Sequence, residues 1–143
     1  MTVEEIKSNI RYNEDLIDQY IREKRILERR IADFDLLKNK YISFQNAFGE
    51  QQQSRQRKLA SFLSSNVQNQ IVGKFYDGMN GLLFGTDFNN AYEGLTEAKR
   101  VINRKITELD QQLDDCKGNL AYRRGRLDYW QRELEAALAE EGI

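Results

Sequence analysis

The chain has 143 residues, the length of one ordinary domain, and its 22 Lys and Arg residues nearly balance 23 Asp and Glu residues, giving a net charge of -1. It contains no histidine, no proline and one cysteine, Cys116. These absences exclude an imidazole base near neutral pH, a histidine-containing zinc site, a Ser-His-Asp triad and an internal disulfide. We therefore expect no enzyme activity, no metal and no cofactor.

The N-terminus and the charge balance bear on where the protein acts. The first residues, MTVEEIKSNI, are acidic and lack the basic and apolar regions of a signal peptide. No apolar run approaches the ~20 residues of a membrane-spanning helix, and the balanced charge predicts no steering towards nucleic acid or acidic membranes. We expect a cytoplasmic protein without membrane insertion. Export by a route that reads no cleavable signal stays open.

Charge and glycine divide the chain into three stretches. Residues 1–58 carry 22 charged side chains and residues 95–143 carry 19, whereas residues 59–94 carry only four and hold five of the nine glycines. This distribution predicts two charged helical arms around an apolar, glycine-rich centre.

The first arm shows a heptad pattern sustained over more than six repeats. Its inward positions, spaced by three and four residues, are Val3, Ile6, Ile10, Asn13, Ile17, Tyr20, Lys24, Leu27, Ile31, Phe34, Lys38, Tyr41, Gln45 and Phe48. Leu16, Leu37 and Phe44 widen the apolar stripe, which favours a bundle over a bare two-stranded seam. Four inward positions are polar (Asn13, Lys24, Lys38 and Gln45). They either fix register or partner, or lie where the seam is wet.

The second arm repeats the pattern. Its inward positions are Ile102, Ile106, Leu109, Leu113, Cys116, Leu120, Arg123, Leu127, Trp130, Leu134 and Ala137. The pattern places Cys116 and Trp130 in the core, and it makes Cys116 a small packing residue rather than a reactive thiol. Gly118 and Gly125 lie off the seam and weaken the helix by ~1 kcal/mol each relative to alanine.

The segment DGMNGLLFGTD, with three glycines in eight residues, is the best turn in the chain, and Thr86 or Asp87 suits the N-cap of the helix that follows. At Gly49 the composition allows either a break or a continuous helix. We predict an all-α fold, a long antiparallel helical hairpin forming a single domain over residues 1–143. Its first arm covers about 3–77, its turn about 78–87 and its second arm about 88–140.

The sequence holds no convergent catalytic or ligand-binding motif. Asp114-Asp115 and Glu140-Glu141 are adjacent acids, which do not face each other on a helix. The glycines of GMNGLLFG match no phosphate-binding pattern. The arginines and aromatic residues of segment 122–130 suggest single-stranded nucleic acid, but acidic neighbours offset their charge, and we expect no such ligand.

The central stretch carries more apolar side chains than two helices cover, and such surfaces commonly mark protein interfaces. The predicted partner-binding residues are Phe75, Met79, Leu82, Leu83, Phe84, Gly85, Phe88 and Tyr92. The alternative is a local cap, in which these side chains pack on one another at the end of the hairpin.

Paired long helices around an aromatic, glycine-containing turn resemble the WXG superfamily, the helical-hairpin substrates and partners of bacterial type VII secretion. Leu83-Phe84-Gly85 stands where that family has Trp-x-Gly, and it is similar to the Leu-x-Gly of LXG toxin domains. Phe88, Ala91 and Tyr92 resemble the residues that open the second helix. In YWQRE, Tyr129 and Glu133 match the family's Tyr-x-x-x-Asp/Glu export signal, and their spacing puts both on one helix face.

The chain length and the missing tryptophan make the resemblance strongest to the small helper proteins of LXG toxins. The resemblance implies a non-enzymatic targeting factor that binds the helical N-terminal domain of such a toxin, with room for a second small helical partner. It would deliver the toxin to the type VII machinery and be secreted with it, without a signal peptide. The alternative is a structural coiled-coil protein or homodimeric helical scaffold with no secretion role.

Overall fold

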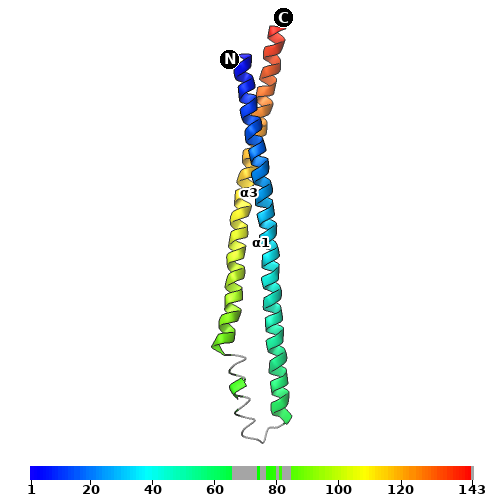
Figure 1. Ribbon diagram of the computed structural model, residues 1–143, viewed down its shortest axis with the longest axis vertical. Helices are drawn as coiled ribbons and strands as arrows, with labels where there is room; N and C mark the ends of the chain where they lie inside the picture. Colours follow the sequence, from blue (N-terminus) through cyan, green and yellow to red (C-terminus); the bar gives the residue numbers. More distant parts are fainter. Residues whose placement is uncertain (66–73, 75–76, 80, 82–84, 143) are drawn as a thin grey trace. The chain divides into compact units, whose positions relative to one another are not determined.

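The computed structural model describes residues 1–65, 74, 77–79, 81 and 85–142. Helix α1 spans Val3–Ser65 and helix α3 spans Thr86–Glu141 (Figure 1). No strand occurs among the described residues. The all-α class predicted from the sequence is confirmed.

Helix α1 begins with a capping box that its sequence encodes. The backbone N–H of Glu5 donates to Oγ1 of Thr2 over 3.1 Å, and the N–H of Thr2 donates to Oε2 of Glu5 over 2.9 Å. These bonds satisfy donors that the first turn of a helix leaves open. The helix then passes through Gly49 without a break, because one glycine weakens a helix by only ~1 kcal/mol and keeps its backbone hydrogen bonds.

The glycine-rich segment falls only partly within the described residues. Helix α1 is described as far as Ser65, and residues 66–73 of the predicted first arm lie outside the described part of the chain. Within the predicted turn, Gly78, Met79 and Gly81 have helical conformation and Gly85 is a bend. Glycine lowers helix stability without forbidding the conformation.

Gly85 is the N-cap of α3. Its carbonyl accepts a hydrogen bond from the N–H of Asn89 over 3.2 Å, the first such bond of the helix. The sequence predicted this role for Thr86 or Asp87, which are the first residues inside the helix. A β-carbon at position 85 would collide with the backbone carbonyl of Gly81, so this close approach requires glycine.

The chain, predicted as a single domain, divides into two packed units. Unit 1 consists of Met1–Asp33 and Ile106–Ile143, and unit 2 consists of Phe34–Lys105. Within each unit a segment of α1 lies beside a segment of α3 (Figure 1). The two segments run in opposite directions in each unit, as the predicted hairpin requires. In unit 1 Tyr20 contacts Cys116, and in unit 2 Gln45 contacts Thr96.

Unit 1 buries an aliphatic core. Tyr20 contacts Cys116 and Asn13 contacts Arg123, so the two helical segments are antiparallel. Every inward position predicted in this unit is buried or half-buried. The buried apolar residues are Ile6, Ile17, Leu27, Leu109, Cys116 and Leu120. Burial of each large aliphatic side chain stabilises the fold by about 1.5–3 kcal/mol relative to exposure.

Unit 2 is also antiparallel, since Gln45 contacts Thr96 and Phe48 stacks on Phe88. Its inward positions on α1 again lie buried or half-buried. Among the described residues of this unit, the buried apolar side chains are Leu59 and Ile102. Two of the residues that widen the apolar stripe of the first arm lie beside the seam and are exposed to solvent. Phe44 is 63% exposed and Leu37 is 40% exposed.

Candidate functional site

The predicted partner-binding set falls partly within the described residues. Met79 and Phe88 are half-buried, and Tyr92 is 40% exposed. The Phe88 ring stacks on Phe48, with centroids 4.7 Å apart and planes 9° from parallel. Tyr92 lies 6.1 Å from Phe88, centroid to centroid. Phe88 is therefore engaged within unit 2, while Tyr92 retains surface for other contacts. The other described member, Gly85, caps α3, and Phe75, Leu82, Leu83 and Phe84 lie outside the described residues.

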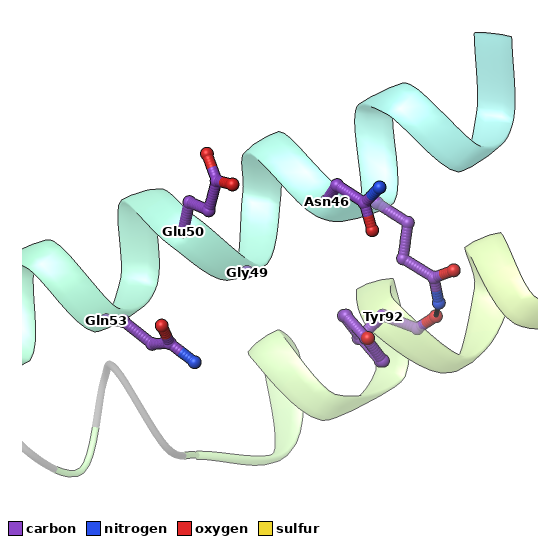
Figure 2. A pocket seen from close by; sticks show the side chains of 6 residues that line it. Asn46, Gly49, Glu50, Gln53 and Tyr92 are labelled. Carbon is purple, nitrogen blue, oxygen red and sulfur yellow. Dashed lines mark hydrogen bonds between the residues drawn. The ribbon is translucent and has the colours of Figure 1, made fainter.

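A pocket of about 210 Å³ lies beside Tyr92. Figure 2 shows that Tyr92 reaches it from α3, whereas the other lining residues follow one another along α1. These residues are Gln45, Asn46, Gly49, Glu50 and Gln53. The missing side chain at Gly49 opens the space, and a β-carbon there would lie 3.9 Å from Cε2 of Tyr92. The lining is amide-rich with a single carboxylate, so it offers polar contacts without a paired acid and base.

Two of the four polar seam residues are buried and hydrogen-bonded. Gln45 is 5% exposed, and its Nε2 donates to Oγ1 of Thr96 over 2.7 Å and to the carbonyl of Tyr92 over 3.4 Å. Asn13 is 2% exposed, and its Nδ2 donates to the carbonyl of Asn9 over 2.8 Å. Because a buried amide is costly without partners, the bonds of Gln45 across the seam favour the register-fixing role that the sequence left open. The bond from Asn13 to Asn9 lies within α1 and does not depend on the register between the helices.

The two lysines of the seam behave differently from the amides. Both Lys24 and Lys38 are half-buried. The Nζ of Lys24 lies 3.6 Å from a carboxylate oxygen of Glu28, one turn further along the surface. A lysine at an inward position can cover the seam with its aliphatic stem and leave its ammonium group in water. Lys24 therefore fits the second alternative from the sequence, a polar residue at a point where the seam is open to solvent.

The two residues of the YWQRE match, Tyr129 and Glu133, are exposed on one face of α3. Tyr129 is 45% exposed, and Glu133 is exposed one turn later. The guanidinium of Arg126 lies 4.7 Å from the Tyr129 ring centre and 5.5 Å from that of Trp130. The Trp130 ring meets Tyr129 edge to face at 5.0 Å. Cation–π and edge-to-face contacts both restrict the tyrosine ring.

A second arginine, Arg123, makes a similar arrangement three residues earlier. The guanidinium of Arg123 lies 5.5 Å from the ring centre of Tyr12 on α1 and 5.1 Å from that of Tyr122. Its Nη1 also donates to Oδ1 of Asn13 over 3.4 Å. Two of the three arginines that suggested nucleic acid, Arg123 and Arg126, thus lie against aromatic rings of this chain. Sequence reasoning missed Tyr12, because only the pairing of the two helices brings it near segment 122–130.

Trp130, predicted in the core, is half-buried, and Cys116 lies in the core of unit 1. Cys116 is 2% exposed, and its thiol donates to the carbonyl of Tyr20 over 3.2 Å. Burial raises the pKa of the thiol, the carboxylate of Glu23 raises it further, and Lys24 partly opposes both. Since the thiolate is the reactive form, Cys116 is a packing residue with low reactivity.

The exposed surface also carries local ion pairs. Arg100 pairs with Glu97 one turn away, and this hydrogen bond lowers the pKa of the Glu97 carboxyl. Arg132 pairs in the same way with Asp128. Exposed pairs of this kind contribute little to stability. Over the described ranges, no group of three or more potential metal-binding side chains occurs.

No described helix has both the length and the apolar character needed to cross a bilayer. Comparison of the chain with models of protein families, with curated proteins and with solved structures finds no match. The structure itself offers three candidate sites. They are the exposed aromatic side chains Tyr129 and Trp130 with Arg126, the pocket beside Tyr92, and the exposed apolar flank of unit 2 at Leu37 and Phe44.

Proposed function

We propose that this chain is a non-enzymatic targeting factor that binds a helical domain of another protein and directs it to export. The resemblance to the helper proteins of LXG toxins makes the N-terminal domain of such a toxin the expected partner, and type VII secretion the expected route. A second small helical protein could join the same complex. The chain would be made in the cytoplasm and leave with its partner.

The observation that carries the proposal is the presentation of Tyr129 and Glu133. The seam uses the inward positions of α3, so these two side chains remain free of the core and lie one turn apart in solvent. Arg126 and Trp130 limit the rotation of the Tyr129 ring. A receptor that reads a tyrosine and an acid on one helix face would meet a tyrosine whose ring is already restricted, which lowers the conformational entropy lost on binding.

The remaining apolar surface supports the binding of a partner. At the arginine–tyrosine contacts of unit 1, Tyr12 is 55% exposed and Tyr122 is 60% exposed, and further along α1 Ile26 is 49% exposed. Aromatic residues and arginine are enriched where proteins bind one another. A helical domain laid on unit 1 would cover these side chains.

Export is tested by secretion from the bacterium that encodes the chain. We expect Tyr129→Ala and Glu133→Gln to keep the protein and its bound partner inside the cell, because each removes half of the recognised pair. Glu135→Gln is the matched control, because Glu135 is an exposed glutamate on the same helix, two residues from Glu133. Normal secretion of both test variants would refute the export signal.

Partner binding needs a separate measurement. We expect the tagged chain, purified from the same cells, to carry an LXG-domain protein in a defined ratio, and Tyr129→Ala to leave this complex intact. If the chain is exported but no LXG-domain protein copurifies with it, the targeting role is refuted and only the export signal is supported. A chain that is neither exported nor bound would be a structural coiled-coil protein.

A further inference from the structure

Two arginines of unit 1, Arg123 and Arg126, lack the acidic neighbour that the other arginines of this unit have. On a helix a side chain meets residues three or four positions away. The other arginines of unit 1 each have an aspartate or glutamate at such a position, as Arg132 has Asp128. The residues at those positions around Arg123 and Arg126 are uncharged, apart from the two arginines themselves. We call these two residues the arginine pair.

Aromatic rings hold the arginine pair in place of acids. One guanidinium lies 5.5 Å from the ring centre of Tyr12 and 5.1 Å from that of Tyr122. The other lies 4.7 Å from the ring centre of Tyr129 and 5.5 Å from that of Trp130. A ring that stacks on a guanidinium covers its face, whereas the N–H donors lie in its plane and stay available.

Most of these donors have no acceptor within the described part of the chain. Nη1 of Arg123 donates to Oδ1 of Asn13 over 3.4 Å. Neither member of the arginine pair forms an ion pair with a carboxylate of the described residues. Both arginines are half-buried, and the tyrosine rings beside them are 45–60% exposed. The arginine pair is therefore a restrained, positively charged site that solvent can reach.

Acidic side chains limit the length of this site. Asp115 precedes Tyr122 by two helical turns, and Glu133 follows Arg126 by two turns, so both lie on the same side of α3 as the site. On α1, Glu5 lies two turns before Tyr12, and its carboxylate accepts the N–H of Thr2. The positive site is about one turn long and has acids beyond both ends, so a long polyanion would meet repulsion there.

We propose that the arginine pair binds two carboxylates that lie one turn apart on a helix of the partner protein. Residues three apart on a helix have β-carbons ~5–6 Å from each other, so an acidic pair on a facing helix matches the spacing of Arg123 and Arg126. A planar guanidinium binds a carboxylate through two parallel hydrogen bonds. Arginine and tyrosine are also the side chains that most often anchor protein interfaces. The inference rests on the proposed function only for the identity of the partner.

The first test measures binding of the full chain to the LXG-domain protein of the same bacterium by isothermal titration calorimetry. The double variant with Arg123→Gln and Arg126→Gln should bind about tenfold more weakly, because two charge pairs are lost. Added salt should weaken the wild-type complex more than that of the variant. Circular dichroism should show equal helix content, since glutamine and arginine have similar helix propensities.

The matched control is the double variant with Arg124→Gln and Arg132→Gln. It removes the same charge from the same helix at two exposed positions, and we expect it to bind like the wild type. If the wild type and the Arg123→Gln, Arg126→Gln variant bind the LXG-domain protein equally well, the inference is overturned and the proposed function stands. If the wild type binds no such protein, the proposed function fails, and the second test decides the inference.

The second test uses a defined probe in place of the partner. The probe is an alanine-based helical peptide with two glutamates four residues apart, and its control has glutamines at the same places. Trp130 is the only tryptophan of the chain and lies 5.5 Å from the guanidinium of Arg126, so its fluorescence reports binding there. We expect a saturable change with the glutamate peptide and none with the glutamine peptide.

The Arg123→Gln, Arg126→Gln variant should not respond to the glutamate peptide. A wild-type chain that ignores this peptide, or responds equally to the glutamine peptide, would overturn the inference, and so would an unchanged response of the variant. A single-stranded oligonucleotide completes the series. Tighter binding of the oligonucleotide than of the glutamate peptide would also overturn the inference, because it would make phosphate the preferred ligand of the arginine pair.

Discussion

Unit 1 and unit 2 are built from the same two helices with the same heptad pattern, but they pack differently. In unit 1, aliphatic side chains fill the seam, and Leu109 at its centre is 1% exposed. In unit 2, aromatic residues such as Phe34, Tyr41 and Phe48 occupy inward positions and stay half-buried. Two helices enclose slender aliphatic side chains better than broad rings, because a two-helix seam is narrow. The same heptad thus yields a closed seam in one unit and a partly open one in the other.

The surfaces beside the seam also differ between the two units. Around Tyr122 and Tyr129, the exposed aromatic rings of unit 1 are covered in part by arginines of the chain itself. Among the described residues of unit 2, no arginine lies against an aromatic ring in this way, and Phe44 is the most exposed of the described large apolar side chains, at 63%. Unit 2 also contains the amide nitrogen of Gln56, which is buried without a hydrogen-bond partner. Exposed large apolar side chains therefore remain in both units, and those around Tyr122 and Tyr129 have arginines against their rings.

The largest expected effect tests whether unit 1 holds the tighter core. Leu109→Ala should reduce the free energy of unfolding by about 2–5 kcal/mol, towards the upper end, because a fully enclosed site cannot collapse around the lost atoms. Leu59→Ala, the same substitution in unit 2 at a residue 8% exposed, should cost less. Urea denaturation of both variants measures the difference. Equal losses would show that the two cores are equally rigid.

A smaller effect concerns the glycines inside the helices. Gly118→Ala should raise the free energy of unfolding by about 1 kcal/mol, since the site is open and alanine favours a helix. Gly49→Ala should give a similar gain, because its β-carbon would meet Tyr92 at an ordinary contact distance of 3.9 Å. Gly85→Ala should lower the melting temperature, because its β-carbon would collide with Gly81. A destabilised Gly49→Ala variant would mean that unit 2 is packed more tightly around Tyr92 than described.

The smallest effect is the pH dependence contributed by Cys116. Burial raises the pKa of this thiol in the folded chain, above the ~8.5 of an unfolded cysteine. Its contribution to stability is therefore fully present below pH ~8.5 and is lost as the pH rises through the folded pKa. Unfolding free energies measured between pH 7 and pH 10 should fall at the alkaline end more for the native chain than for Cys116→Ala. Native Cys116 should also react slowly with a thiol reagent until the chain unfolds. Rapid reaction at neutral pH would show that unit 1 opens readily.

Much of the fold follows from residue spacing alone. The three-and-four pattern identified both helices and their inward faces, including the place of Cys116. Spacing also put Tyr129 and Glu133 on one exposed face. These features are local, because the rotation per residue of a helix decides which side chains share a side. The capping box of Thr2 and Glu5 has an equally local signature, T-x-x-E, that the sequence reasoning overlooked.

Tertiary structure decided what depends on pairing between distant segments. Whether a polar seam residue is buried and bonded depends on its neighbour across the seam: Gln45 has Thr96, whereas Lys24 turns to Glu28 on its own helix. The contact of Tyr12 with Arg123 joins residues more than a hundred positions apart.

The sequence by itself therefore determined the class of fold, the inward face of each helix and the absence of histidine chemistry. Only the paired helices decided which apolar flank is covered and which is left open, as at Phe44. The physical reason is that the spacing of residues decides which side of a helix each side chain points to, whereas its exposure depends on which other helices pack against that side.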